Sequence, residues 1–310
     1  MEQRAEYGEQ IVSAVGRQLT AEFGRGFSEK SVRHMVRFAE VFSDARIVSA
    51  LLRQLSWTHF TRLIYIEDAL KRDFYAEMCR IENWSTRTLE KKISGMLFER
   101  TALSKKPDAL IRRELDQLRS EDKVTPDLVF RDPYILDFLG LKDRYVEKDI
   151  EDGITRELER FIIELGTGFA FVARQKRIQI DHDDYYLDLL FFHRGLRRLV
   201  AIDLKLREFQ PGDKGQMELY LRWLAKYDQQ AGEELPIGLI LCAGQKREQI
   251  ELLEVEKSGI RVASYWTELL PKKLLQRKLH EAIVRARDHV DGAASNKKLR
   301  NRRKKQRAAW

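Results

Sequence analysis

The stretch Leu199-Val-Ala-Ile-Asp-Leu-Lys-Leu206 is an apolar run, suited to a buried strand, that carries two charges two residues apart. Residues i and i+2 of a strand point to the same face of a sheet, so we expect Asp203 and Lys205 to project together. Burying two charges is costly unless they pair or bind an ion. Upstream, Tyr185-Tyr-Leu-Asp-Leu-Leu-Phe-Phe192 is a second apolar run with one interior acid, Asp188. Two neighbouring strands that each carry a carboxylate predict one shared site.

The segments around these two runs predict an α/β arrangement. Residues 145–165 have apolar side chains at helical spacing and are followed by Gly166 and Gly168, so a helix is expected to end there. Turn-like residues at 181–184 and 194–195 favour antiparallel pairing of adjacent strands. In chain order we expect a helix at 145–165, strands at 169–180, 185–193 and 196–206, a helix at 212–227, a strand at 236–243, a helix at 249–257 and a strand at 260–266.

Residues 1 to about 100 are expected to be nearly all helical, because no proline precedes Pro107 and glycine is scarce. Residues that favour helix amino termini divide this part into short helices. We expect Ser28 to cap a helix through Phe42, Ser43 or Asp44 one through Leu55, Ser56 one toward Cys79, and Ser85 or Thr86 a fourth.

Short helices joined by polar turns are typical of helix-turn-helix modules, in which the second helix presents its first turn to DNA. The side chains that would contact nucleic acid in such a module are aromatic or basic. They are Trp57, His59, Arg62, Trp84, Arg87, Lys91 and Lys92. The alternative is that the tryptophans belong to the core and the basic side chains are merely solvated.

Three prolines, Pro107, Pro126 and Pro133, interrupt a charged stretch after the helical part, as expected of a connection between domains.

Together, the helical amino-terminal part and the later mixture of helices and strands predict an α+β protein. Its parts would be an all-α, helix-turn-helix-like domain at 1–105, a linker at 106–133, an α/β/α domain with a central mixed sheet at 134–288, and a basic tail at 289–310.

The net charge of +8 is concentrated at the end of the chain. Residues 297–307 hold eight basic residues and no acid, so the rest of the chain balances 49 basic with 49 acidic groups. Such a segment either adds salt-sensitive attraction to phosphates or is simply a solvated end. The basic residues are Lys297, Lys298, Arg300, Arg302, Arg303, Lys304, Lys305 and Arg307.

The residue content excludes several classes of protein. Two cysteines, Cys79 and Cys242, are too few for a disulfide framework or a cysteine zinc site. No stretch approaches the roughly 20 apolar residues of a membrane span, and the amino terminus lacks a signal-peptide pattern, so we expect a cytoplasmic protein without membrane contact. The sequence has no phosphate-binding loop, no zinc-type histidine pair and no nucleophile elbow, which argues against motors, zinc enzymes and serine hydrolases.

Asp188, Asp203 and Lys205 together suit phosphodiester hydrolysis. Two nearby carboxylates repel, and a divalent cation relieves that repulsion while it activates water. Oxygen ligands favour magnesium or manganese over zinc. The lysine would orient or deprotonate the attacking water and stabilise negative charge on the phosphate. The alternative is a buried ion pair of Asp203 with Lys205 that has a structural role only.

Two flanking helices add candidate side chains. On a helix that turns by about 100° per residue, Glu157 lies roughly 75° from the centre of the apolar stripe and Glu159 roughly 125° away, so Glu157 is expected to reach the sheet. In the helix at 212–227, Gln216 and Tyr220 are four residues apart and share a face, where they would position a ligand or DNA. The alternative is that this amide and phenol only pack against the sheet.

This ordered set resembles the PD-(D/E)XK nuclease superfamily, and within it the bacterial YhcG type. The resemblance rests on Glu157, Asp188, the triplet Asp203-Leu-Lys205, and Gln216 with Tyr220, which look like the extra motif of the RecB-like branch. The phrases Gly168-Phe-Ala-Phe-Val172 and Pro236-Ile-Gly-Leu-Ile-Leu-Cys242 are similar to that type as well. The similarity extends over nearly the whole chain, because YhcG-like proteins join a helical DNA-binding domain to a carboxy-terminal nuclease domain.

The resemblance implies a restriction-endonuclease-like fold around a magnesium site, where manganese can replace magnesium. Glu157, Asp188 and Asp203 would be the metal-site acids, and the catalytic set would add Lys205, Gln216 and Tyr220. The sequence departs from the superfamily pattern at two positions. Leu187 precedes Asp188 in place of the proline of the superfamily name, and position 203 is Asp where Glu is more frequent.

We therefore expect a magnesium-dependent nuclease of DNA, with a role in DNA repair, recombination, restriction or defence, and with nucleic acid and proteins of such a complex as partners. A homodimer would place two sites on opposite strands, and nothing in the sequence decides this. The alternative is a DNA-binding scaffold whose nuclease-like domain is inactive. Loss of Asp203 would abolish cleavage but spare binding.

Overall fold

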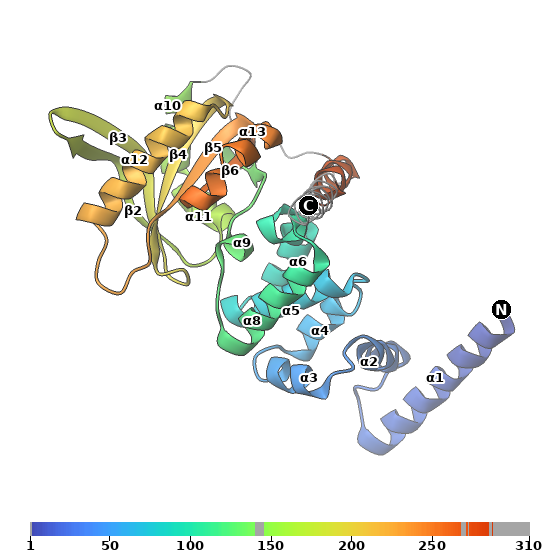
Figure 1. Cartoon of the computed structure of the whole chain (residues 1–310). Coiled ribbons are helices and arrows are strands. Elements are labelled where there is room, and N and C mark those ends of the chain that lie inside the picture. The colour runs from blue at the N-terminus through green and yellow to red at the C-terminus, as the bar shows by residue number, and fades with distance from the viewer. Residues whose placement is uncertain (1, 140–145, 268–270, 272, 285–286, 288–310) are drawn as a thin grey trace, which may run out of the picture. The chain divides into compact units, whose positions relative to one another are not determined.

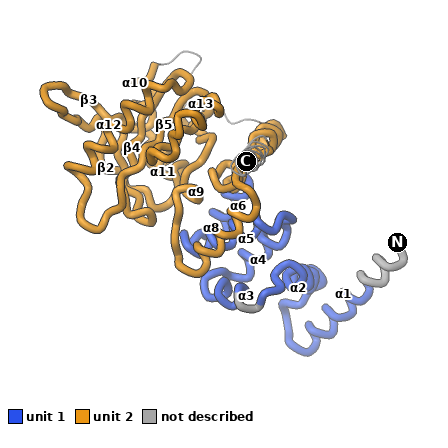
Figure 2. The backbone as a smooth tube through the Cα atoms, in the orientation of Figure 1, with its two compact units in different colours: residues 1–95 blue, residues 96–310 orange. Residues whose placement is uncertain are grey.

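The computed structural model describes residues 2–139, 146–267, 271, 273–284 and 287. The chain divides into two compact units, residues 1–95 and residues 96–310, which Figure 2 shows in different colours. The division thus falls ten residues before the boundary expected at 105, and the expected linker at 106–133 belongs to the second unit. The expected tail at 289–310 lies outside the described residues.

Unit 1 is built from helices with polar caps. The side chains of Ser28 and Ser85 accept the backbone N–H groups of Ser31 and Thr88, so both of these expected caps are confirmed. The described helices of unit 1 are α1 (Glu2–Phe23), α2 (Glu29–Val41), α3 (Ala45–Leu52), α4 (Trp57–Leu63), α5 (Ala69–Glu82) and α6 (Thr86–Ser94) (Figure 1).

The helix expected from Ser56 toward Cys79 is divided in two, because Asp68 caps α5 through the N–H of Lys71. The division lets α4 contribute Phe60, which is fully buried, to an aromatic cluster. The rings of Phe38 and Phe42 meet Phe60 edge to face with centroid distances of 5.0 and 5.5 Å. Aromatic packing of this kind stabilises a small helical unit.

Unit 2 contains a six-stranded sheet with helices on both faces (Figure 1). Within the part of the chain that is described, no helix is long and apolar enough to cross a membrane. The elements of unit 2 are α7 (Leu97–Arg100), η1 (Ala102–Lys105), α8 (Asp108–Glu121), α9 (Pro126–Val129), β1 (Tyr134–Ile135), η2 (Asp137–Leu139), α10 (Glu147–Arg156), α11 (Leu158–Leu165), β2 (Phe169–Ile180), β3 (Asp183–His193), β4 (Arg198–Glu208), α12 (Pro211–Tyr227), β5 (Ile237–Gly244), α13 (Arg247–Leu252), η3 (Val255–Ser258), β6 (Ile260–Trp266) and a further helix at 273–284.

The sheet has the strand order β1-β6-β5-β4-β3-β2. β2, β3 and β4 pair in an antiparallel manner, as the short turns between them predict. β4, β5, β6 and β1 pair in parallel, with a helix or a helical segment in the connections β4–β5 and β5–β6. The expected mixed sheet between helical layers is confirmed.

Alternating side chains of the central strands supply two separate hydrophobic cores. Residues such as Ile202 and Leu204 pack with Ile154 of α10 and with Phe161 of α11 on one face. On the opposite face, apolar residues of β3, β4 and β5 pack with Tyr220 and its neighbours in α12. Both faces of β4 are therefore buried, which explains why its sequence is almost continuously apolar.

The stretch expected as a linker is an integral part of unit 2. Lys106 forms ion pairs with Glu114 of α8, at 2.6 Å, and with Asp127 of α9. Asp127 also lies 3.1 Å from the guanidinium of Arg261 in β6. Pro107 and Pro126 stand at the starts of α8 and α9, where proline is favoured. Neither of them marks a connection between domains.

Candidate active site

The site begins where β3 separates from β4. The ladder between β3 and β4 runs from His193↔Arg198 to Leu189↔Ile202 and ends there. On the amino-terminal side of Leu189, β3 pairs with β2 alone, as far as the hairpin turn that joins β2 to β3. Asp188 is the first β3 residue past that pair. Its Oδ2 accepts the backbone N–H of Leu204 at 2.8 Å, so a carboxylate occupies the hydrogen-bonding position that a strand would otherwise take.

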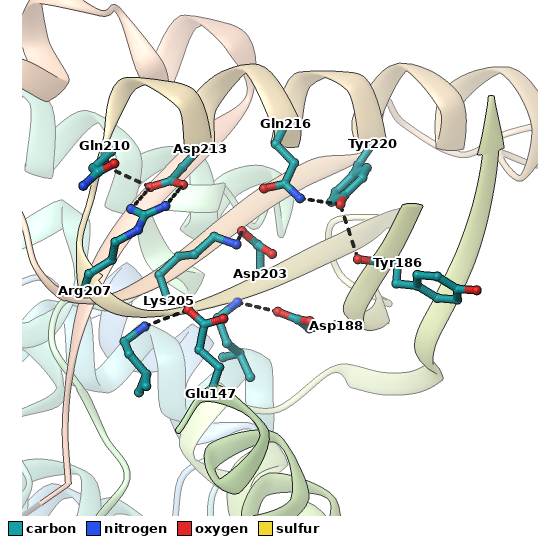
Figure 3. Close-up of polar contacts among 12 residues, drawn as sticks. Glu147, Tyr186, Asp188, Asp203, Lys205, Arg207, Gln210, Asp213, Gln216 and Tyr220 are labelled. Carbon is teal, nitrogen blue, oxygen red and sulfur yellow. Dashed lines mark hydrogen bonds and ion pairs between the residues drawn. The ribbon is translucent and has the colours of Figure 1, made fainter. Parts of the chain in front are cut away.

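Asp203 and Lys205 project from β4 to one face, as the strand spacing predicts (Figure 3). Lys205 Nζ lies 2.9 Å from Asp203 Oδ2, and the two side chains are 13% and 4% exposed. The contact is an ion pair without the geometry of a hydrogen bond, since Oδ2 is a buried atom that accepts no hydrogen bond from the described residues. The ion pair proposed as the structural alternative is therefore formed, within reach of a second carboxylate.

The charged groups shift one another's pKa. Burial raises the pKa of Asp203 to about 7, against the charge of Lys205 and with a further contribution from the charge of Asp188. Burial also raises the pKa of Asp188. Burial acts to lower the pKa of Lys205, but the charge of Asp203 raises it overall. Two carboxylates thus share one ammonium group, an arrangement that favours the arrival of further positive charge.

Gln216 and Tyr220 form a chain of contacts from α12 to β3 (Figure 3). Gln216 Nε2 donates to the Tyr220 hydroxyl at 2.6 Å, and that hydroxyl donates to the backbone carbonyl of Tyr186 at 3.3 Å. Tyr186 precedes Asp188 by two residues. Gln216 and Tyr220 therefore support the backbone of β3 next to Asp188. The alternative, that these two side chains only pack against the sheet, does not account for their hydrogen bonds.

The expected single helix at 145–165 is two helices. Glu157 ends α10 and precedes α11, with φ −106° and ψ 32°. The expected rotation of Glu157 from the apolar stripe assumes one continuous helix, so it does not apply across this break. The described contact of the Glu157 carboxylate is with Arg160, at 3.5 Å. Among the described contacts of Glu157, none is with Asp188 or Asp203, and its role as a metal ligand stays a prediction.

Two other acids of α10 approach the site. Glu147 Oε1 accepts the N–H of Leu206 in β4 at 3.2 Å (Figure 3), and its charge raises the pKa of Lys205. Glu151 is buried, and its charge raises the pKa of Asp188. Sequence reasoning missed both, although they precede the buried Ile154 by seven and three residues, which places them on its side of a helix.

The carboxyl end of β4 is joined to the start of α12 by one acid. Arg207 donates to both carboxylate oxygens of Asp213, at 2.7 and 2.8 Å, and the backbone N–H of Gln210 donates to the same acid at 2.8 Å (Figure 3). Bidentate guanidinium pairs hold a fixed geometry. This clamp positions the amino-terminal turns of α12, from which Gln216 projects.

The residues expected to bind nucleic acid in unit 1 have different environments. His59 is buried and its Nε2 lies 2.9 Å from the carbonyl oxygen of Trp84, so it is placed as a structural residue of α4. Trp84 is buried, whereas Trp57 is partly exposed and contacts Phe38. The exposed basic residues are on α4 and α6. They are Arg62, which pairs with Glu90 at 2.5 Å, Arg87 and Lys91, together with the half-buried Lys92 beside the Trp84 ring.

The expected basic contacts at 297–307 lie outside the described residues. The helix-turn-helix assignment stays a prediction. Its best support is the turn from α5 to α6, where Asn83 has a left-handed φ of 51° and joins the two helices through three residues.

The donors at the acid pair fit a magnesium ion. Among the described residues, no group of three or more acids, histidines or cysteines forms a closed metal site. Magnesium commonly binds through one or two carboxylates and completes its coordination with water and phosphate oxygens. A cation beside Asp188 and Asp203 would also serve the buried Oδ2 of Asp203 and offset the repulsion between the acids. These two residues would therefore hold it.

Comparison with known proteins identifies the class and then the family. Residues 127–280 match the model of the YhcG PDDEXK nuclease domain, so this part of the chain belongs to the PD-(D/E)XK nuclease class. Residues 1–100 match the DUF1016 N-terminal domain. The chain is 35% identical over 271 residues to "Putative nuclease YhcG" of Escherichia coli (strain K12), across 78% of this chain and 72% of that protein. The chain belongs to the YhcG family.

Solved structures give weaker matches. One is described as "crystal structure of a repair endonuclease from Pyrococcus abyssi", with a TM-score of 0.29 and 20% identity, covering 42% of this chain and 50% of that chain. Another is "Structure of EndoMS-dsDNA2 complex", with a TM-score of 0.30 and 17% identity, covering 42% and 49%. The chain spans about half the length of each.

Proposed function

We propose that this nuclease hydrolyses phosphodiester bonds of DNA in a divalent-metal-dependent reaction, with magnesium as the ion. The observation that carries the proposal is the convergence of Asp188 and Asp203, from adjacent strands, on one side of Lys205. When bound, the ion supplies neutralisation of phosphate charge and a lower pKa for the attacking water. Asp188 and Asp203 would hold it, and burial of Asp203 excludes bulk water from one side.

Lys205 has an electrostatic role in this proposal. Its pKa is raised by the charge of Asp203, so the ammonium stays protonated at neutral pH. It can then orient the attacking water through that water's oxygen and donate to a phosphate oxygen as negative charge develops. Of the two roles expected from the sequence, orientation is favoured over proton abstraction.

DNA is proposed as the substrate because exposed basic side chains on α4 and α6 suit phosphate contacts, and because the resemblance stated from the sequence implies a DNA-binding helical domain. The biological role would lie in DNA repair, recombination, restriction or defence. Partner proteins of such a complex and a homodimer belong to the same proposal.

The first test is cleavage of labelled linear, supercoiled, branched and single-stranded DNA and of RNA, with magnesium, manganese or chelator. Asp203→Ala and Lys205→Ala should each lower the rate at least about 100-fold, because each removes charge stabilisation specific to the reaction. Asp183→Ala is the matched control, since this acid is exposed on the hairpin of β3. Magnesium should also raise the unfolding temperature of the native chain.

Cleavage that persists in chelator, or an Asp203→Ala variant as active as the native chain, would refute the metal-dependent mechanism. If no substrate is cut and all variants bind DNA equally, the chain acts as a binding scaffold. If the native chain cuts only RNA, the proposal of DNA as the substrate is wrong, while the proposal of metal-dependent phosphodiester hydrolysis stands.

A further inference from the structure

Gln175 has an unusual backbone for its position. Its φ is 45°, in the left-handed region, and it lies in the middle of β2. The other described non-glycine residues with positive φ lie at helix ends or in turns. A left-handed conformation is costly for a residue with a Cβ, and such strain persists where the surrounding structure imposes it.

The side chain of Gln175 contacts the first acid of the site. The ladder pairs Arg174↔Leu189 and Lys176↔Leu187 flank it, so Gln175 stands opposite Asp188 across the two strands. Gln175 Nε2 donates to Asp188 Oδ1 at 3.1 Å.

Both oxygens of the Asp188 carboxylate are thereby oriented. Oδ1 accepts the amide of Gln175, and Oδ2 accepts the backbone N–H of Leu204. Each carboxylate oxygen has two lone pairs, so each keeps one for another partner. A carboxylate fixed at both oxygens cannot rotate freely, which favours a ligand that needs one defined orientation.

We propose that Gln175 is a positioning residue for the cation site, which holds the Asp188 carboxylate in the orientation that binds the ion. The inference rests on the proposed function and names a residue that acts through Asp188 rather than on the substrate. A purely structural role is a poor account of it, because Gln175 is exposed and its backbone is strained. Folding alone would be served better by glycine, which adopts this φ without a Cβ.

The test uses the full-length chain and manganese ion as the probe. Gln175→Gly removes the amide and relieves the strain, and Gln175→Met removes the amide but keeps the length of the side chain. In chelator, Gln175→Gly should unfold at a temperature no lower than that of the native chain. Titration calorimetry should show that both variants bind manganese about 10-fold more weakly, the loss typical of residues that orient metal ligands.

Arg197→Gly is the matched control, because Arg197 has a φ of 50° in the turn between β3 and β4 and makes its described ion pair with Glu234. It should relieve strain and leave manganese affinity unchanged. If the native chain binds manganese and both Gln175 variants bind as tightly, the inference fails and the proposed function stands. If the control weakens binding as much as they do, the amide is not the cause and the inference fails. A native chain that binds no manganese overturns the proposed function together with the inference.

Discussion

At the residue scale, His193 at the end of β3 shows how burial fixes a protonation state. Its ring packs edge-on against Phe169 at a centroid distance of 4.7 Å, and its Nδ1 accepts the N–H of Leu196 at 3.0 Å. Gly168 has a φ of +88°, and a Cβ there would stand 3.2 Å from the ring, so glycine is needed at this position. Burial lowers the pKa of His193 to about 4. The folded protein therefore holds a neutral imidazole.

We predict that His193 makes the free energy of unfolding fall as pH falls from about 6.5 to about 4, in opposition to Asp203, whose pKa of about 7 makes the folded state take up a proton in the same range. The unfolded histidine takes up a proton near its ordinary pKa of about 6.5, and the folded one only near 4, so the folded state binds fewer protons in this window. The loss below pH 4 is at most on the order of 3 kcal/mol. Urea unfolding of the native chain and of a His193 variant between pH 7 and pH 5 measures the onset of this loss as the difference between the two proteins, because the contribution of Asp203 is common to both.

His193→Asn is the companion variant, since its amide oxygen can accept the N–H of Leu196 but does not titrate. It should be less sensitive to acid than the native chain over the same range. An equal pH dependence in both proteins would assign the acid sensitivity to other groups.

Local patterns predicted part of the site. Asp188, Asp203 and Lys205 interrupt apolar strands, and this contrast is visible without a structure. Glu147 and Glu151 were missed although their spacing from Ile154 in α10 indicates the buried side of the helix, because the choice was made between Glu157 and Glu159, at and beyond the end of α10. Gln175 carries no signal at all, since neither its φ nor its contact with Asp188 follows from neighbouring residues.

At the element scale, the carboxylate of Glu164 joins α11 to the end of α7, to Arg131 and to β1. Glu164 Oε1 accepts from the guanidinium of Arg100 at 2.5 Å and from the N–H of Ile135 at 2.9 Å. Arg131 lies 3.4 Å from its Oε2. Both guanidinium groups are nearly buried, with side chains 6% and 5% exposed. Removing the shared acid would leave two buried positive charges with less compensation.

We predict that Glu164→Gln lowers the free energy of unfolding of unit 2 by about 3–5 kcal/mol, the usual cost of removing one partner of a buried ion pair. Glu159→Gln on the same helix is the control. It is exposed and should change stability by less than about 0.5 kcal/mol. Urea unfolding of the full-length chain, followed by circular dichroism, measures both. Equal effects of the two substitutions would mean that the Glu164 contacts carry no special stability.

Periodicity predicted the large elements well. β2 and β6 have the expected bounds, and α12 agrees to one residue at its start. β1 was missed because two residues, Tyr134–Ile135, are too few for an alternating pattern. The segment at 106–133 was taken for a linker because its prolines were interpreted as breaks between domains. Pro107 and Pro126 stand instead where α8 and α9 begin, and Pro133 directly precedes β1. Asp127 of α9 pairs with Lys106 of the same segment and with Arg261 of the distant β6.

At the scale of the whole molecule, charge is distributed unevenly along the chain. Eight basic residues at 297–307 account for the net charge of +8, while the rest of the chain is neutral. Attraction to a polyanion that depends on salt should therefore come mainly from this segment, with a smaller share from exposed side chains of unit 1. In the proposed mechanism, the cleavage chemistry belongs to the acids and the lysine of unit 2.

We predict that deleting residues 297–310 flattens the salt dependence of DNA binding. Each phosphate contact contributes about 0.9 to the slope of log affinity against log salt concentration, so a loss of about two or more is expected. Fluorescence anisotropy measures the affinity for DNA at salt concentrations from about 50 to about 200 mM, and the slope is taken from these values. The change in slope caused by the combined Arg87→Gln and Lys91→Gln substitution gives the contribution of unit 1 to the salt dependence. An unchanged slope after the deletion would give the segment another purpose.

The hydrogen bond from Leu204 to Asp188 bears on how this protein could evolve. Residue 188 accepts a hydrogen bond from the backbone of β4 and, in the proposed mechanism, also supplies a negative charge for cleavage. Only the requirement for the charge is lost when cleavage is no longer selected. A descendant without activity would thus be free to replace the acid by asparagine, which still accepts the N–H, but not by alanine. Such a lineage would keep its fold while it loses the proposed nuclease activity. Inactive relatives should therefore be recognised by an amide at this position rather than by a damaged core.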